Sequence, residues 1–285
     1  MSDYCDVEMN EAEESCRASL KKNAKRLVIK VGTSSLTHDN GSLNLNQVER
    51  LCRVLADLRN LNYEVILVTS GAIAVGISRL RLTKRPTDLR ELQAVAAVGQ
   101  TDLMSLYRKF LSEYNQVCGQ ILLTRDDVDD DITKMNLINT FEALLDAGVI
   151  PIVNENDSVS TTEVMHNGTF GDNDMLSAIV AELVHADVLL LLSDVSGLYQ
   201  QDPRTLDAAE AAACFVSYVK DLSEVRHFGG GAGSGRGTGG MQSKLSAAEI
   251  CQCAGLPMLI LAGDNPRAIL DILRGERQGT IFDVL

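Results

Sequence analysis

The sequence lacks three features that would place it in other classes of protein. It has no apolar stretch near 18 residues, and its acidic start, Met1–Glu14, lacks the charged and apolar regions of a signal peptide. It has no run of Lys and Arg to offset a formal charge of −13, from 39 acidic and 26 basic residues. This charge repels nucleic acid and anionic membranes. We therefore expect a cytoplasmic protein that binds neither.

The cysteines indicate neither a disulfide framework nor a zinc site. Their number is odd and no Cys-x-x-Cys pair occurs among Cys5, Cys16, Cys52, Cys118, Cys214, Cys251 and Cys253. The four histidines are equally dispersed along the chain. We therefore expect no metal site built from cysteine or histidine side chains.

The 285 residues, 45% of them hydrophobic, are enough for one large α/β domain or two small ones. Apolar runs predict strands, separated by helical patterns, at Arg26–Val31, Glu64–Thr69, Val117–Leu123, Val149–Val153, Asp187–Leu192 and Leu256–Leu261. Alternating strands and helices predict a single α/β domain over residues 25–285, a three-layer αβα sandwich around a mainly parallel sheet. Residues 1–24 are polar and aperiodic, which predicts a disordered tail.

Several local patterns predict how elements begin and where loops lie. Asn46 is predicted to cap a helix with Glu49 completing a capping box, and Asn265 to cap another with Pro266 at its first position. An acidic loop is expected at Arg125–Asp131, and a small hairpin at Val159–Gly168.

Polar and glycine-rich loops follow the predicted strands. In parallel sheets, ligands bind at the C-terminal ends of the strands. The polar or small residues at or just beyond such ends are Lys30, Ser70, Asn154–Asp157, Ser193–Asp194 and Gly263. The loop Gly171–Asp174 leads into a helix, whose N–H groups and dipole would face an anion. Asn and Asp also collect in turns for backbone reasons, but two such loops around one element favour a ligand site.

The stretch Gly229–Gly240 has eight glycines in twelve residues. Its Gly235–Gly240 part matches the dinucleotide pattern GxGxxG, but it follows no predicted strand and no acidic residue ends a strand about 20 residues later, so we do not expect an NAD site. A flexible linker explains residues 229–236. It does not explain the end, Thr238-Gly-Gly-Met-Gln-Ser-Lys244, whose composition suits a phosphate at a helix start. The sequence has no GxxxxGK[ST] motif and no protein-kinase signature set.

Six motifs in this order resemble the amino-acid kinase family, and within it the branch that phosphorylates glutamate. They are Lys30-Val-Gly-Thr-Ser, Thr69-Ser-Gly-Ala72, Asn154-Glu-Asn-Asp157, Gly171-Asp-Asn-Asp174, Ser193-Asp194 and Thr238-Gly-Gly-Met-Gln-Ser-Lys244. The resemblance runs from about Arg26 to Phe282. Sibling kinases share the architecture but are not expected to carry the two Asn/Asp motifs together.

The resemblance implies transfer of a phosphoryl group from ATP to the γ-carboxylate of L-glutamate, the first step of proline synthesis. It implies a glutamate lobe at residues 26–185 and a nucleotide lobe at 186–285. Lys30 and Lys244 would neutralise the transferred group, and Asp174 would orient both lysines. Glutamate would contact Ser70, Gly71, Asp157 and Asn173. The nucleotide would contact Lys30, Ser193, Asp194, Thr238, Gly239, Gly240, Met241, Gln242, Ser243 and Lys244, with Mg²⁺ carried by the ATP phosphates.

This chemistry suits the residues present, because a carboxylate is ionised at pH 7 and needs no general base. The family also implies a homo-oligomer, either a dimer or a tetramer, and inhibition by proline. Many bacterial relatives continue into a PUA domain, which we do not expect because the sequence ends at Leu285. Two rivals are a sibling kinase of aspartate, N-acetylglutamate or carbamate, and a catalytically idle amino-acid sensor. The presence of both lysines and Asp174 disfavours the sensor.

Overall fold

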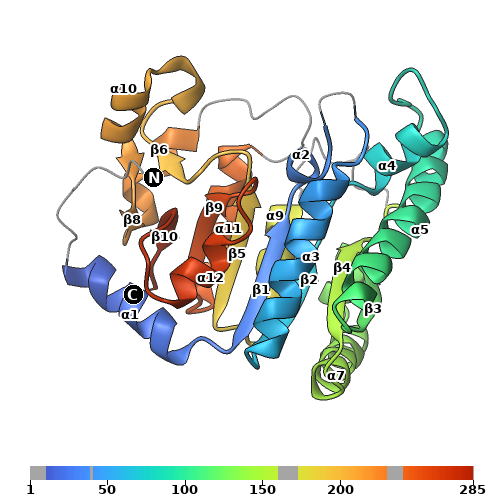
Figure 1. Cartoon of the computed structure of the whole chain (residues 1–285), viewed down its shortest axis with the longest axis horizontal. Helices are drawn as coiled ribbons and strands as arrows, with labels where there is room; N and C mark the ends of the chain where they lie inside the picture. The colour runs from blue at the N-terminus through green and yellow to red at the C-terminus, as the bar shows by residue number, and fades with distance from the viewer. Residues whose placement is uncertain (1–10, 39–40, 160–172, 230–239, 285) are drawn as a thin grey trace.

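The computed structural model describes residues 11–38, 41–159, 173–229 and 240–284, and within them an eight-stranded sheet forms the centre of the molecule (Figure 1). Its strand order is β3-β4-β2-β1-β5-β9-β10-β8, and the pairs are parallel except for β10 against β9. The bounds are β1 Arg26–Val31, β2 Glu64–Val68, β3 Cys118–Leu123, β4 Ile150–Glu155, β5 Val188–Ser193, β8 Tyr218–Val219, β9 Met258–Ala262 and β10 Thr280–Phe282. A separate antiparallel pair joins β6 Leu198–Tyr199 and β7 Phe215–Val216.

Helices cover both faces of this sheet. Apolar side chains of α1, α3, α5 and α12 pack on one face, and those of α7, α9 and α11 pack on the other. The helices are α1 Glu11–Asn23, α2 Thr33–Leu36, α3 Leu45–Asn60, α4 Ala72–Arg79, α5 Leu89–Glu113, α6 Arg125–Asp129, α7 Asp131–Asp146, α9 Asn173–Leu183, α10 Ala208–Ala213, α11 Met241–Cys253 and α12 Ala268–Leu273. The predicted mainly parallel αβα sandwich is confirmed.

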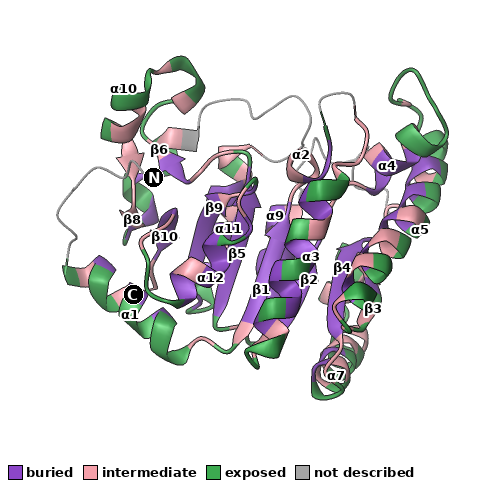
Figure 2. Cartoon of the chain, in the orientation of Figure 1, coloured by how far each residue is buried: buried purple, intermediate pink, exposed green. Residues whose placement is uncertain are grey.

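The central strands are buried along nearly their whole length (Figure 2). In β1, Leu27 and Ile29 belong to the core cluster under α3 and α5, while Val28 belongs to the cluster under α9 and α11. A strand with both faces covered must be apolar at consecutive positions. For this reason all six strands predicted from apolar runs are present, with each end within two residues of its prediction.

The predicted disordered tail is wrong for residues 11–23, which form α1. This helix is polar because its buried face makes ionic contacts. Arg17 and Glu13 are buried and form an ion pair at 2.8 Å, and Arg17 also donates to the carbonyl oxygens of Gln278 and Gly279. Arg277 approaches Glu13 at 3.3 Å. These three partners of α1, Gln278, Gly279 and Arg277, lie more than 260 residues away in the sequence.

Three further local predictions are wrong. Helix α3 is capped by Asn44, whose side chain accepts from the N–H of Gln47, so the helix starts before Asn46. Helix α12 begins at Ala268 with Arg267 as N-cap, beyond Asn265 and Pro266. The acidic segment 125–131 is not a loop but contains α6 and the first residue of α7. The predicted hairpin lies almost entirely outside the described residues.

Glycines bring α4 and α5 into close contact. A Cβ on Gly99 would lie 1.8 Å from the carbonyl oxygen of Ala72, and one on Gly76 would lie 2.0 Å from that of Val95. Only hydrogen at these positions allows the two backbones to approach so closely. This contact fixes α4, and with it the loop Ser70–Gly71 that precedes α4 at the end of β2.

Candidate active site

Two lysines and one aspartate from three elements meet at the C-terminal edge of the sheet. Lys30 lies near the end of β1, Asp174 in the first turn of α9, and Lys244 in the first turn of α11. Nζ of Lys30 is 2.5 Å from Oδ1 of Asp174, and Nζ of Lys244 is 3.0 Å from Oδ2. All three side chains are buried, and Asp174 has an exposed fraction of 0%. The structure thus brings together the three residues predicted to be catalytic.

The charge balance of this trio favours an anionic ligand. Burial tends to raise the pKa of Asp174, but the Lys30 and Lys244 ammonium groups outweigh burial and lower the pKa to about 2. Asp174 is therefore a carboxylate at neutral pH. With both lysines protonated, the trio carries a formal charge of +1 in a buried place. Buried charge is stable only when it is paired, so an anion beside the lysines is electrostatically favourable.

The loop after β2 and the last part of β4 are joined to the start of α9 by amide hydrogen bonds. The Asn173 side-chain NH₂ lies 2.7 Å from Oγ of Ser70, 2.9 Å from the carbonyl oxygen of Thr69 and 3.1 Å from Oδ1 of Asn154. Asn154 in turn donates to Oε1 of Gln100 on α5 at 2.8 Å. Two predicted glutamate-binding residues, Ser70 and Asn173, are therefore in direct contact.

The two remaining predicted glutamate-binding residues lie in adjoining loops. Gly71 caps α4 with φ of 100°, a left-handed conformation that favours glycine. Asp157 lines a pocket of about 220 Å³ together with Gln100, Glu155, Asn156 and Ser158. Oδ1 of Asn173 is buried without a hydrogen-bond partner among the described residues. A buried orphan acceptor of this kind is rare and is satisfied by a donor from a ligand or water.

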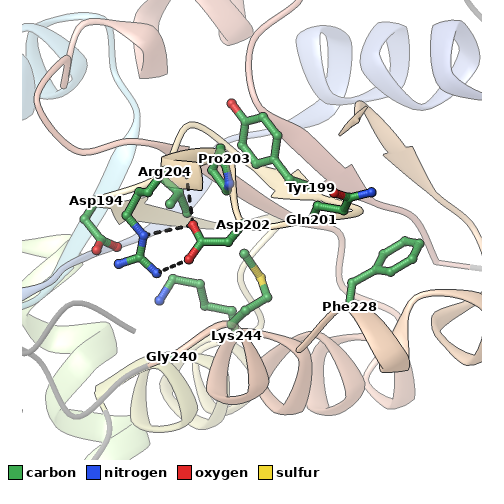
Figure 3. A pocket seen from close by; sticks show the side chains of 11 residues that line it. Asp194, Tyr199, Gln201, Asp202, Pro203, Arg204, Phe228, Gly240 and Lys244 are labelled. Atoms are coloured by element: carbon green, nitrogen blue, oxygen red, sulfur yellow. Dashed lines mark hydrogen bonds and ion pairs between the residues drawn. The ribbon is translucent and has the colours of Figure 1, made fainter. Parts of the chain in front are cut away.

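Lys244 also lines a second pocket (Figure 3). The charged side chains of Asp194, Asp202, Arg204 and Lys244 gather at one end, and the rings of Tyr199 and Phe228 lie toward the other. The rest of the lining comes from Val195, Gln201, Pro203, Gly240 and Met241. Apolar and aromatic surfaces with a small number of placed polar groups are typical of a small-molecule pocket.

The predicted nucleotide-binding residues fall into three groups. Asp194, Gly240, Met241 and Lys244 line the pocket. Four others lie nearby but do not line it: Lys30, Ser193, Gln242 and Ser243. The Ser193 hydroxyl lies 3.1 Å from Oδ1 of Asp194, and Oγ of Ser243 lies 3.5 Å from Oδ2 of Asp174. Gln242 is exposed. Thr238 and Gly239 lie outside the described residues.

Sequence reasoning missed part of the pocket wall. Tyr199, Arg204 and Phe228 come from β6 and two short 3₁₀ helices, which carry no periodic pattern. Arg204 contacts Asp202 through two side-chain hydrogen bonds of 2.9 and 2.8 Å. The only signal in the sequence is the dipeptide Asp202-Pro203, which indicates a turn but not a ligand.

No group of three or more His, Cys, Asp or Glu side chains able to hold a metal occurs among the residues that the structure describes. The prediction that metal enters only with the nucleotide remains a prediction. Within the same residues, no helix is both long and apolar enough to span a membrane.

The αβα sandwich around a mainly parallel sheet is shared with solved structures. UMP kinase from Bacillus anthracis has a TM-score of 0.59 at 19% identity, covering 91% of this chain and 96% of that chain. UMP kinase from Ureaplasma parvum has a TM-score of 0.60 at 16% identity, covering 92% and 99%. The amino acid kinase family model matches residues 25–262, and the chain belongs to the amino acid kinase family.

Curated relatives with much higher identity include glutamate 5-kinases. The chain is 51% identical to glutamate 5-kinase of Clostridium perfringens over 92% of this chain and 96% of the relative. It is 53% identical to that of Listeria monocytogenes serovar 1/2a over 93% and 95%, and 46% identical to that of Clostridium tetani over 94% and 98%.

Proposed function

We propose that this chain catalyses the ATP-dependent phosphorylation of the γ-carboxylate of L-glutamate, forming L-glutamyl 5-phosphate in the first step of proline biosynthesis. The observation that carries the proposal is the buried Lys30–Asp174–Lys244 trio, which stands between an amide-rich loop cluster and a nucleotide-like pocket. Identity of about half to glutamate 5-kinases over nearly their full length supports glutamate as the acceptor.

The reaction is a displacement at phosphorus. An oxygen of the γ-carboxylate forms a bond to the γ-phosphorus of ATP, and the bond from that phosphorus to the bridging oxygen breaks, with ADP leaving. No proton is transferred, because the acceptor is already ionised at neutral pH. The barrier comes from bringing two anions together, so the useful groups are preorganised cations. Lys30 and Lys244 are these cations, and Asp174 holds each in place.

Amino-acid recognition follows from the polarity of the loops. The α-ammonium of glutamate is a donor, and Oδ1 of Asn173 and the carboxylate of Asp157 are acceptors of the required kind. The Ser70 hydroxyl and the N–H of Gly71 are donors for the α-carboxylate, and Gly71 stands at the N-terminal end of α4, where an anion is favoured.

The nucleotide occupies the pocket beside Lys244. Tyr199 and Phe228 supply ring surfaces for the base, and Arg204 and Lys244 supply positive charge for phosphates. Mg²⁺ prefers phosphate oxygens supplemented by one or two carboxylates. Asp194 fits that requirement, because it lines the pocket, whereas Asp202 is engaged by Arg204. When bound, the ion withdraws charge from the transferred phosphoryl group.

The proposal extends to assembly, regulation and location. The enzyme is a homo-oligomer, a dimer or a tetramer, in the cytoplasm, and proline inhibits it at or near the glutamate site. The glutamate 5-kinase relatives support this part only by analogy.

A coupled ADP-release assay tests the acceptor. L-glutamate is expected to be turned over with a kcat/KM at least about tenfold above that for aspartate, which is one methylene shorter, and for N-acetylglutamate, which lacks the ammonium. A preference for either alternative would indicate a sibling kinase. ATP or glutamate binding without turnover of any acceptor would indicate a sensor.

A further inference from the structure

A groove with four arginines lies between α3 and α12, on the face of the sheet opposite α9 and α11. Figure 1 shows these two helices on the same side of the sheet. The groove has a volume of about 380 Å³. We name it the arginine groove and define it by its lining: Arg50, Arg53, Val54, Asp57, Asn265, Pro266, Arg267, Leu270 and Arg274.

The charge of the arginine groove is opposite to that of the protein. Four guanidinium groups and one carboxylate, that of Asp57, line it in a chain with a formal charge of −13. A guanidinium nitrogen of Arg274 also lies 3.9 Å from Oδ1 of Asp271. All four arginines are exposed and accessible to a ligand, whereas Val54, Pro266 and Leu270 form a buried apolar floor. Like charges gathered around a concave site raise the local concentration of counter-charged molecules.

The chemistry of this lining suits an organic phosphate. The planar fork of arginine matches the oxygens of phosphate bidentately, and such charge-assisted hydrogen bonds are about twice as strong as neutral ones. The volume is within the range of small-molecule pockets, roughly 300–1,000 Å³. The apolar floor suits a carbon body between phosphate groups, which inorganic phosphate lacks.

A short chain of hydrogen bonds connects this groove to the nucleotide pocket, although the residues that form it are far apart in the sequence. Arg50 contacts Oε1 of Gln47 at 3.5 Å, and the buried Gln47 amide donates to the carbonyl oxygen of Gly263. The N–H of Gly263 donates to the carbonyl oxygen of Ser193 at 2.6 Å. Ser193 precedes Asp194, which lines the nucleotide pocket.

Gly263 leaves this route little freedom to deform. A Cβ at this position would lie 2.2 Å from Oγ of Ser35 and 2.8 Å from the carbonyl oxygen of Ser193. A shift of Gln47 therefore moves the Gly263 backbone against the end of β5. Close packing of this kind transmits small displacements.

We propose that the arginine groove is a regulatory site for an organic phosphate, and that its occupancy changes nucleotide affinity through Gln47, Gly263 and Ser193. The coupling rests on the proposed nucleotide pocket, but ligand binding to the groove does not. The site is separate from the Lys30–Asp174–Lys244 trio, because Asp174 and Lys244 lie on α9 and α11, which cover the opposite face of the sheet.

Isothermal titration with fructose 1,6-bisphosphate, a bisphosphate without a nucleobase, tests the site. The unmodified protein is expected to bind it, and the double variant Arg53→Gln/Arg267→Gln to bind it at least about tenfold more weakly, because two charge-assisted contacts are lost. Arg90→Gln, which removes an exposed arginine on α5, is expected to bind it normally. Lys244→Met is also expected to retain binding, because Lys244 belongs to the other pocket.

Each contrary result overturns the site. Absence of binding at millimolar bisphosphate does so, as does binding that survives the double variant. Equal weakening in Arg90→Gln would show a diffuse charge effect, and loss in Lys244→Met would place the ligand in the nucleotide pocket. Circular dichroism and thermal unfolding of the double variant establish that it is folded; a surface change of this kind is expected to leave both unaltered.

Titration with a non-hydrolysable ATP analogue tests the coupling. Saturating bisphosphate is expected to shift the dissociation constant of the analogue about fivefold or more, and the analogue must shift that of the bisphosphate by the same factor. Gln47→Met keeps the size of the side chain but removes its amide, so it is expected to bind bisphosphate and to lose the shift. An unchanged analogue affinity in the unmodified protein would overturn the coupling, whether or not the chain phosphorylates glutamate.

Discussion

The ammonium of Lys244 lies 3.0 Å from Oδ2 of Asp174, although the two residues are 70 positions apart in the sequence. Each is in the first turn of its helix, where the dipole favours negative charge. Asp174 is therefore well placed on α9, whereas Lys244 on α11 is not. A buried lysine at a helix N-terminus requires anionic partners, and Asp174 is one of them. We infer that the transferred phosphoryl group is the other.

Replacing Asp174 with asparagine tests this pairing. Asp174→Asn keeps the shape of the side chain but leaves Lys30 and Lys244 without its charge. Loss of one partner from a buried ion pair costs about 3–5 kcal/mol, so the free energy of unfolding in urea is expected to fall by roughly that amount. Asp271→Asn serves as the control, because Asp271 forms a longer ion pair, of 3.9 Å, with the exposed Arg274. This substitution is expected to change the free energy of unfolding by less than about 1 kcal/mol. Equal effects would show that the trio is not specially stabilising.

The same carboxylate predicts a pH dependence of stability. Its pKa in the folded protein, about 2, is below the ordinary value of 3.8, because the two lysines outweigh burial. A depressed pKa contributes stability that is present above the unfolded pKa and is lost as pH falls through the folded one. The contribution of Asp174 is therefore expected to decline between about pH 4 and pH 2. Urea unfolding across this range is expected to show a smaller acid loss in Asp174→Asn, and an identical loss would contradict the assignment.

The glutamate site is tested at Asp157. Asp157→Asn removes a carboxylate that we assign to the substrate ammonium, so the KM for glutamate is expected to rise roughly tenfold or more, since a charge-assisted contact is lost. The KM for ATP is expected to change little, because Asp157 lies in the loop after β4 and does not line the nucleotide pocket. Steady-state kinetics with each substrate varied separately make the comparison. An equal rise in both KM values would refute the assignment.

The contact between α4 and α5 gives a prediction about stability. Gly99→Ala places a Cβ against the backbone of Ala72, and neither backbone can move without displacing the loop Ser70–Gly71. Overpacking of a rigid contact costs about 1–3 kcal/mol or more, and we expect thermal unfolding at a lower temperature together with a higher KM for glutamate. Val98→Ala, one residue earlier and more exposed, is expected to change the free energy of unfolding by no more than about 0.5 kcal/mol. A fully stable Gly99→Ala would show that the helices can separate without cost.

The central architecture could be predicted because it follows from local apolar runs. Strands such as β1 and β5 are covered on both faces and are continuous in hydrophobicity. Helix α1 could not be predicted, because Glu13 and Arg17 are buried by ionic contacts with residues near the other end of the chain. The sequence of residues 11–23 alone does not indicate that these distant residues contact it. The short strands β8 and β10 carry only two and three residues, too few for a periodic signal.

The candidate site was predictable where its residues form motifs and hidden where they do not. Lys30, Asp174 and Lys244 each belong to a motif of the family, and the structure brings them together. Gln100 is the opposite case. It lies within a long amphipathic helix, and only the fold reveals that its side chain accepts from Asn154. Arg204 and Phe228 could not be predicted either. They belong to no motif, and only the fold shows that short 3₁₀ helices bring them to the pocket.

The most direct measurement compares single-turnover and steady-state rates of Lys30→Met and Lys244→Met with those of the unmodified protein. If both lysines neutralise the phosphoryl group mainly in the transition state, each variant is expected to lose roughly 10² or more in kcat with a modest change in KM. Arginine is not expected to rescue either position, because its planar fork is larger than an ammonium. Lys134→Met, at an exposed position of α7, is the matched control and is expected to retain normal kcat. A near-normal kcat for folded Lys244→Met at saturating ATP would contradict the account.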